Sequence, residues 1–307
     1  MGGSRRGREG VELILLVVAW YGSSVLAITT SKMCMQMAEV PLLLCACQFL
    51  TATCGSWSML SASNGALRLT RNSETRAVAK TAAAYAMGFL LTNLAFAMAA
   101  ASFVETVKAG EPVSTAALAA SWLGERESVA TYLSLAPIVL GIALATATED
   151  TAPVLSLATL VTLGSNVCFS LRAVFVKQLK QSCPSSAPAK SAVVLFYHVS
   201  RFGFPVFIVC AFLRGDPARV IEAPGISLPF FVAALFANGL GYSAYNLASF
   251  MVLNRVSTTT HAVLNVCRRV VVIAVTTLYF RTPLSLAGAA GILIAAAGVF
   301  LYANAKT

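Results

Sequence analysis

The chain has 307 residues, of which 58% are hydrophobic and only 11% are charged, and its mean hydropathy is +0.78. Soluble domains carry roughly 25% charged residues, so this composition excludes an ordinary soluble fold and indicates a membrane protein. The formal net charge is +10. No basic run is interleaved with aromatic residues, so we interpret the basic residues as loop charges that set the membrane topology and not as a nucleic-acid-binding surface.

Apolar runs long enough to cross a bilayer follow one another along the chain after a short polar leader, residues 1–10. A membrane span needs roughly 18–25 predominantly apolar residues. The first run is too long, and lacks the cleavage pattern, for a removable signal peptide. The sequence therefore predicts an all-α polytopic membrane protein with about ten transmembrane helices. These lie near 11–30, 38–60, 79–99, 103–123, 130–148, 153–176, 191–213, 227–250, 257–280 and 283–303.

Basic residues are unevenly distributed between the predicted loops. The positive-inside rule places the more basic loops, and with them both termini, on the cytosolic side or its topological equivalent, which requires an even number of spans. The odd-numbered loops carry Lys32, Arg214, Arg219, Arg281 and the acidic pair Glu149–Asp150. The even-numbered loops and the two ends carry Arg5, Arg6, Arg8, Arg68, Arg71, Arg76, Lys80, Arg126, Lys177, Lys180, Lys190, Arg255 and Lys306.

An internal repeat divides the chain into two halves. GERESVATYLSLAPIVLGIALAT (124–146) aligns without a gap with RTPLSLAGAAGILIAAAGVFLYA (281–303), which sets Gly141 on Gly298. The halves, residues 11–150 and 151–307, would hold five spans each and form one transporter domain. Because five is odd, the second half would enter the membrane from the opposite side. Inverted repeats of this kind are typical of transporters whose substrate site lies near the midplane.

Charged residues inside the predicted spans are mostly basic. A charge at the centre of a span costs at least ~2.5–3.5 kcal/mol, so such side chains usually face a cavity or a partner. Two adjacent arginines, Arg268 and Arg269, lie within one apolar stretch. The basic residues outnumber the acids, which leaves about three positive charges for an anionic ligand to neutralise. The set comprises Lys108, Arg172, Arg201, Arg268 and Arg269 against Glu105 and Glu111.

Polar and aromatic residues recur at helical spacing in five of the spans, so each set shares one face and the faces could line one polar cavity. Three other readings stay open. Small polar residues could join helices, Lys108 could pair with Glu105 or Glu111, and Arg172 could extend to the membrane surface. The sets are Tyr85, Phe89 and Thr92; Glu105, Lys108 and Pro112; Ser165, Phe169 and Arg172; Asn238, Tyr242, Tyr245 and Ser249; and His261, Asn265, Arg268 and Arg269.

No pattern in the sequence indicates a cofactor or an enzyme. The eight cysteines mostly lie within apolar spans and show no zinc-type spacing, since Cys45 and Cys47 are too close together. Only His198 and His261 are present, without the metalloprotease, hydrolase or P-loop motifs. We therefore expect no cofactor, no metal and no intramembrane enzyme.

Four segments resemble one known family, the sugar-phosphate/phosphate (triose-phosphate) translocators of the drug/metabolite transporter superfamily. SFVETVKAGEPVSTAALAASWLGE resembles the family pattern SFTHxxKxxEPxFS…LGE. LAPIVLGIALATATE and SNVCFSLRAVFVKQL are similar to the family's next two helices. YNLASFMVLNRVSTTTHAVLNVCRRVVVIAV resembles YNxxxxxxLxxVxPxTHAVxNxxKRVxVI. The similarity covers most of residues 80–307.

This resemblance implies ten helices in two inverted halves and exchange of a phosphorylated metabolite for inorganic phosphate across a lipid bilayer. It places phosphate binding on Lys108, Arg268 and Arg269. The organic part of the substrate would lie among Thr92, Arg172, Phe169 and Tyr245.

The chain departs from the family pattern at three positions. Arg268 replaces the usual lysine, Glu105 stands where plastid members often carry histidine, and Phe89 stands where several members have a substrate-contacting histidine. These differences leave the phosphate ester undetermined. A nucleotide-sugar antiporter of the same fold is the main alternative, and a scaffold or enzyme is a third. The membrane could be plastid-derived or endomembrane, and the sequence does not indicate an oligomeric state.

Overall fold

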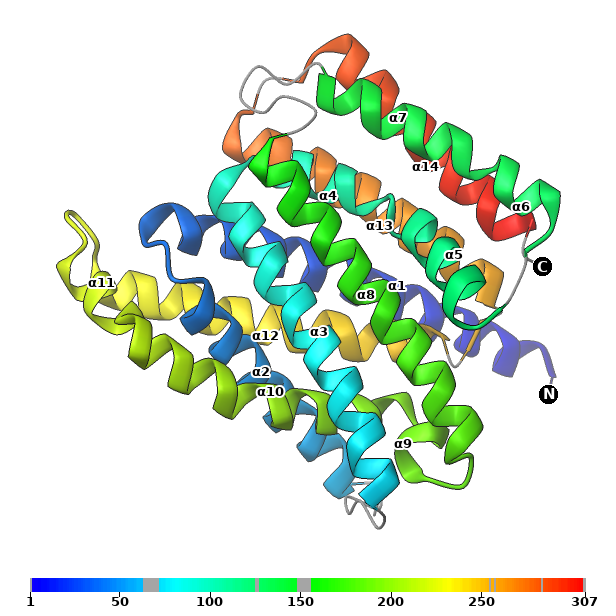
Figure 1. Cartoon of the computed structure of the whole chain (residues 1–307), viewed down its shortest axis with the longest axis horizontal. Coiled ribbons are helices and arrows are strands. Elements are labelled where there is room, and N and C mark those ends of the chain that lie inside the picture. Colours follow the sequence, from blue (N-terminus) through cyan, green and yellow to red (C-terminus); the bar gives the residue numbers. More distant parts are fainter. Residues whose placement is uncertain are drawn as a thin grey trace.

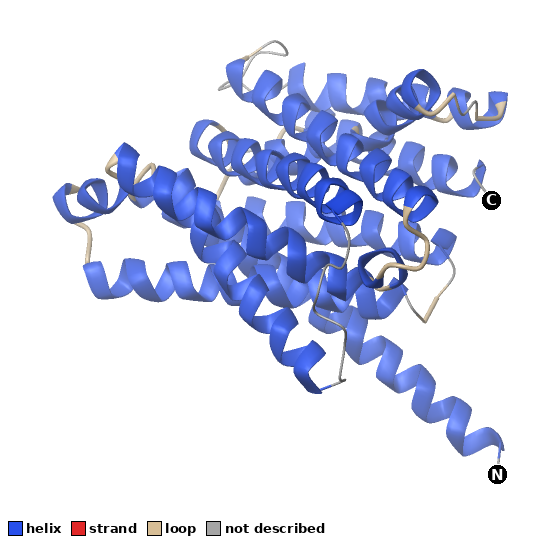
Figure 2. Cartoon of the chain, turned by 60° about the horizontal axis from the view of Figure 1, so that its bottom comes forward, coloured by secondary structure: helices blue, strands red, loops and turns tan. Residues whose placement is uncertain are grey.

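Helices account for almost all of the residues that the computed structural model describes, which are 2–62, 72–124, 127–147, 156–253, 255–256, 258–282 and 284–305. No strand occurs in these ranges, and the helices pack side by side with short connections (Figures 1 and 2). The first seven helices are α1 (Gly2–Met37), α2 (Pro41–Ala62), α3 (Asn72–Met98), α4 (Ala101–Lys108), α5 (Glu111–Trp122), α6 (Val129–Leu133) and α7 (Leu135–Ala147). The others are α8 (Leu157–Ser182), α9 (Ala187–Lys190), α10 (Ala192–Arg214), α11 (Asp216–Glu222), α12 (Leu228–Leu253), α13 (Thr258–Phe280) and α14 (Leu286–Ala305).

Seven helices of the described ranges are long and apolar enough to cross a membrane, namely α1, α2, α3, α8, α10, α12 and α14. This finding confirms the predicted class, an all-helical protein with several membrane-length helices. A helix or a pair of helices overlaps each of the ten ranges that the sequence predicts. The count of ten spans stays a prediction.

The predicted span 103–123 is broken into α4 and α5, so the expectation of one continuous helix was wrong. The break lies at Ala109 and Gly110, and Pro112 follows in the first turn of α5. Proline has no N–H to donate and favours the first turn of a helix, which explains why a second helix begins here. A side chain at Gly110 would come within 2.9 Å of Ile142, so the connection packs directly on α7. The break places Lys108 at the end of one helix and Glu111 at the start of the next.

The first helix is longer than expected and contains a residue that the sequence placed in a loop. Lys32 lies within α1 and is buried, with an exposed fraction of 8%. Several other predicted loop charges, together with the predicted boundary between the halves at residue 150, lie outside the described residues; the charges are Arg68, Arg71, Arg126, Glu149, Asp150 and Lys306. Both termini lie at the same end of the bundle in Figures 1 and 2.

Close helix packing holds the elements that surround the site. α1 lies along α12, α3 lies along α8, α2 packs on α10, and α4 packs on α13. α7 crosses α14 so closely that a Cβ atom at Gly141 would lie 2.3 Å from the backbone nitrogen of Ala295. Small residues permit such backbone contact between membrane helices, where dispersion replaces the hydrophobic effect as the driving force. Figure 1 shows this pair above the rest of the bundle.

Candidate functional site

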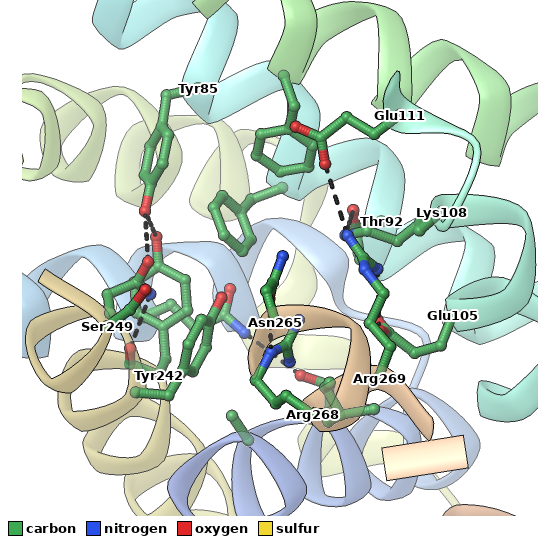
Figure 3. Close-up of a pocket in the computed structure, with 18 of the residues that line it drawn as sticks. Tyr85, Thr92, Glu105, Lys108, Glu111, Tyr242, Ser249, Asn265, Arg268 and Arg269 are labelled. Atoms are coloured by element: carbon green, nitrogen blue, oxygen red, sulfur yellow. Dashed lines mark hydrogen bonds and ion pairs between the residues drawn. The ribbon is translucent and has the colours of Figure 1, made fainter. Parts of the chain in front are cut away.

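A cavity of about 320 Å³ lies among α1, α2, α3, α4, α5, α8, α12 and α13. Charged side chains enter it from helices that are far apart in the sequence, and Figure 3 shows several of them converging. Aromatic residues of α3, α8 and α12 form much of the remaining wall. The charged lining residues are Glu105, Lys108, Glu111, Arg172, Arg268 and Arg269.

Arg269 is held by two carboxylates across the interface between α13 and the broken helix. Its Nη1 lies 3.2 Å from Oε2 of Glu105, and its Nη2 lies 3.5 Å from Oε2 of Glu111 (Figure 3). Glu105 has a side-chain exposed fraction of only 3%, whereas that of Glu111 is 27%. Because a buried carboxylate without a partner is costly, the Glu105–Arg269 pair accounts for the presence of an acid at this depth.

Lys108 and Arg268 face the cavity without an acidic partner within ion-pair distance in the part of the chain that the structure describes. The ammonium of Lys108 donates to Oγ1 of Thr92 at 3.0 Å and lies 4.8 Å from the ring centroid of Phe169. Nε of Arg268 donates to Oδ1 of Asn265 at 3.0 Å, and its terminal nitrogens have no hydrogen-bond partner among the described residues. Neutral oxygens and a ring face orient these cations but leave their charge uncompensated. Among the described residues Lys108 forms no ion pair with Glu105 or Glu111, the pairing that the sequence left open; both acids contact Arg269 instead.

Aromatic side chains and a further arginine form another wall of the cavity. The guanidinium of Arg172 lies over the ring of Tyr85 at 5.4 Å and over that of Phe169 at 5.7 Å. Tyr242 donates its hydroxyl proton to the hydroxyl oxygen of Tyr85 at 3.1 Å, and Tyr85 donates in turn to Oδ1 of Asn246 at 3.2 Å. This wall offers flat apolar faces together with hydroxyl and amide groups, which suits the organic part of a small ligand.

A buried amide network closes the cavity toward the C-terminal ends of α1 and α3. Nδ2 of Asn93 donates to Oε1 of Gln48 at 3.0 Å, and Nε2 of Gln48 donates to Oδ1 of Asn238 at 2.9 Å. Asn238 donates to the carbonyl of Ala27 at 2.7 Å. The network joins α1, α2, α3 and α12, and its polar groups are satisfied by one another, as buried amides require.

Lys32 stabilises the helix packing at the same end of the cavity. Its ammonium donates to the carbonyl oxygens of Phe96 at 2.7 Å and Ala99 at 2.8 Å. These carbonyls lie at the C-terminal end of α3, where the helix dipole favours a positive charge. Lys32 therefore ties α1 to the junction between α3 and α4.

Comparison with known proteins identifies the family of this chain. A family model, the Triose-phosphate Transporter family, matches residues 11–303. The chain belongs to this family. It is therefore a multi-pass membrane protein of a transporter family, in agreement with the resemblance that the sequence motifs carry.

Three relatives of this family member are plant proteins of plastids. Phosphoenolpyruvate/phosphate translocator 1 of Oryza sativa subsp. japonica is 35% identical over 234 residues, which cover 75% of this chain and 56% of the relative. Phosphoenolpyruvate/phosphate translocator 3 of the same plant is 30% identical over 302 residues, covering 97% of this chain and 75% of the relative. The triose phosphate/phosphate translocator of non-green plastids of Brassica oleracea var. botrytis is 30% identical over 313 residues, covering 99% and 75%. The chain thus spans little more than half the length of the first relative and three quarters of the other two.

A protein of known crystal structure shares the fold. It superposes with a TM-score of 0.60 at 14% sequence identity and covers 96% of this chain and 97% of its own. At 14% identity this similarity shows only that the helices are arranged in the same way.

The structure brings together all seven residues that the sequence proposed for the site of this transporter. Each lines the cavity: Thr92, Lys108, Phe169, Arg172, Tyr245, Arg268 and Arg269. Arg201, whose role the sequence left open, does not; it is exposed and lies over the ring of Phe202. Pro112 was expected on the same face as Lys108, but the helix break turns Glu111 toward the cavity instead.

The sequence reasoning missed four polar lining residues: Ser31, Gln48, Asn93 and Asn246. Gln48, Asn93 and Asn246 are uncharged polar residues inside predicted apolar spans, which is the signal that could have found them, whereas Ser31 lies one residue beyond the predicted end of the first span. His261, expected to pack or cap, stacks on Trp20 at 4.9 Å and hydrogen-bonds Ser249 at 3.1 Å. Within the described residues no group of three or more histidine, cysteine and acidic side chains could hold a metal ion, and the cysteines are free.

Proposed function

We propose that this chain is a secondary antiporter that exchanges a small phosphorylated metabolite for inorganic phosphate by alternating access. The observation that carries the proposal is the pair of buried cations, Lys108 and Arg268, which face one cavity without an acidic partner among the described residues. A phosphate group, which carries roughly −1.5 to −2 at neutral pH, is a ligand whose charge and oxygen geometry match them. The names of the relatives, all phosphate translocators, support the same reading.

The role of each residue follows from its position in the charged or in the aromatic part of the cavity wall. Lys108, Arg268 and Arg269 bind the phosphate, since lysine supplies a point charge and arginine supplies paired N–H donors. Thr92, Phe169, Arg172 and Tyr245 surround the organic part of the substrate, because they add a hydroxyl, ring faces and a distal charge around the same cavity.

Obligatory exchange, without net transport of one anion, follows from the free-energy cost of closing the cavity while it is empty. Two uncompensated cations in a poorly solvated cavity disfavour closure, because each has lost water without gaining a partner. A bound phosphate removes most of this penalty through charge-assisted hydrogen bonds. Only the loaded transporter would then pass between its two open states.

The packing of the helices supports two inverted five-span repeats, residues 11–150 and 151–307. In such a repeat α1 corresponds to α8, α2 to α10, and α3 to α12. The α1–α12 contact then corresponds to the α8–α3 contact, and the α2–α10, α4–α13 and α7–α14 contacts correspond to themselves. The site would lie where the broken helix of one half meets α13 of the other, a common arrangement in transporters.

The size of the cavity favours a small ester over the nucleotide sugar that the sequence left open. Its 320 Å³ lies at the lower end of the roughly 300–1,000 Å³ typical of ligand pockets. The plastid relatives favour a plastid-derived membrane over an endomembrane, and the loop charges favour both termini on the cytosolic side.

The proposal is tested by reconstitution of the purified chain in liposomes. Vesicles preloaded with phosphate, with a nucleoside monophosphate or with neither are assayed for uptake of labelled phosphate and of phosphate esters. We expect uptake only into the vesicles that contain phosphate. Equal rates with and without an internal anion contradict exchange, and uptake driven by the nucleoside monophosphate alone identifies the nucleotide-sugar alternative.

A further inference from the structure

Glu105 is the most buried acid of the cavity. Its side chain is 3% exposed, and its only ion-pair partner within the described residues is Arg269, at 3.2 Å. It lies on α4 one turn before Lys108, so it shares the wall that would contact a phosphate. A carboxylate beside an anion-binding site repels the ligand, and its presence therefore needs an explanation.

The charges that face the cavity leave a net surplus of two positive charges, since four cations are opposed by two carboxylates. The cations come from α4, α8 and α13, and the carboxylates come from α4 and α5; α1, α2, α3 and α12 contribute neutral side chains to the wall, with His261 of α13 counted as neutral. Lys32 lies next to the cavity, but its ammonium is bound by two carbonyls at the end of α3. The groups counted are Lys108, Arg172, Arg268 and Arg269 against Glu105 and Glu111.

A surplus of two charges matches a phosphate dianion. Interactions between charges are stronger and less screened in a poorly solvated cavity than in water, so a ligand binds best when the loaded site is close to neutral. An ester that also bears a carboxylate carries about three negative charges at neutral pH. Its third charge would exceed the surplus of the cavity and remain uncompensated, a costly arrangement for a buried charge.

We propose that Glu105 determines the substrate specificity of the site by limiting the charge of the bound ligand to two. The chain then takes inorganic phosphate and phosphate monoesters without a further carboxylate, and it discriminates against phosphorylated carboxylic acids. This inference rests on the proposed exchange function. It separates the chain from those relatives whose names specify phosphoenolpyruvate.

Glu111 supplies a matched comparison for Glu105. It contacts the same guanidinium, at 3.5 Å, but its side chain is 27% exposed. Solvent screens an exposed charge more effectively than a buried one. Removal of the Glu105 charge should therefore change selectivity more than removal of the Glu111 charge, although both substitutions raise the cavity surplus by one.

The test measures exchange of labelled phosphate in liposomes loaded with phosphate. External glycerol 3-phosphate, a dianion, and phosphoenolpyruvate, about a trianion at neutral pH, compete with the label for the wild type, Glu105→Gln and Glu111→Gln. In the wild type we expect glycerol 3-phosphate to compete at least ten-fold more effectively. Glu105→Gln should reduce this preference ten-fold or more, and Glu111→Gln should reduce it less.

Two results overturn the proposal. One is a wild type that binds phosphoenolpyruvate as well as glycerol 3-phosphate, a result that stands even if the variants fail to fold. The other is an unchanged preference in folded Glu105→Gln. Failure of the exchange function itself is distinguishable, because labelled phosphate would then not enter against internal phosphate in any protein, wild type included.

Discussion

Lys108 provides the sharpest test of the site, because its replacement should remove binding without removing stability. Lys108→Met keeps much of the length and apolar stem of the side chain and deletes only the ammonium. Thr92, the hydrogen-bond partner of the ammonium, retains the hydroxyl of Ser165 at 2.8 Å and the carbonyl of Gly88 at 2.9 Å. Glu105 retains Arg269 at 3.2 Å. No described polar group is therefore left without a partner.

The expected loss of exchange follows from the interaction that disappears. A hydrogen bond to a charged group contributes about 1.5–3 kcal/mol, and each ~1.4 kcal/mol corresponds to a factor of ten in affinity. Lys108→Met should therefore lower phosphate exchange by roughly ten-fold to a hundred-fold, with a melting temperature close to that of the wild type. Lys180, which is exposed on α8, is the control, and Lys180→Met should leave exchange unchanged.

The assay combines exchange in liposomes with thermal unfolding in detergent, with and without phosphate. A ligand that binds only the folded state raises the melting temperature, so phosphate should stabilise the wild type and Lys180→Met but not Lys108→Met. The reasoning would be refuted by a Lys108→Met protein that exchanges phosphate within three-fold of the wild type. It would also be refuted by a large loss of stability without phosphate, which indicates a structural role.

Three further predictions concern charge geometry, packing and topology. Arg268→Ala should reduce exchange ten-fold or more while Arg268→Lys retains substantial exchange, since the lysine keeps the charge; equal losses in the two variants would show that the charge alone does not suffice. Gly141→Val should lower the melting temperature, because a Cβ there would lie 2.3 Å from the Ala295 nitrogen and overpacking costs about 1–3 kcal/mol. Gly22→Ala, where a Cβ meets nothing within 4 Å, is the control, and equal melting temperatures for the two variants would contradict the close packing. Tags at the two termini should be accessible from the same side of sealed vesicles, and opposite accessibility would exclude an even number of spans.

Helical spacing was a reliable guide to the faces of single helices. Asn238, Tyr242, Tyr245 and Ser249 were predicted to share a face of one span; the last three line the cavity, whereas Asn238 binds α1 and α2 beside it. The same reasoning failed at Pro112, because it assumed a continuous helix through Gly110. Periodicity counts residues along one helix, so a break between two residues changes the register of every residue after it.

The sequence by itself determined the membrane class, the family and the seven proposed site residues that line the cavity. Composition and periodicity are properties of single segments, and a basic pair inside an apolar span indicates a polar partner wherever that partner lies. Only the tertiary structure decided which charges are paired. Arg268 and Arg269 are adjacent in the chain, yet Arg268 donates a hydrogen bond to Asn265 whereas Arg269 forms ion pairs with Glu105 and Glu111. Neighbouring residues point about 100° apart on a helix of 3.6 residues per turn, so the packing of α4 on α13 determines which arginine meets the acids.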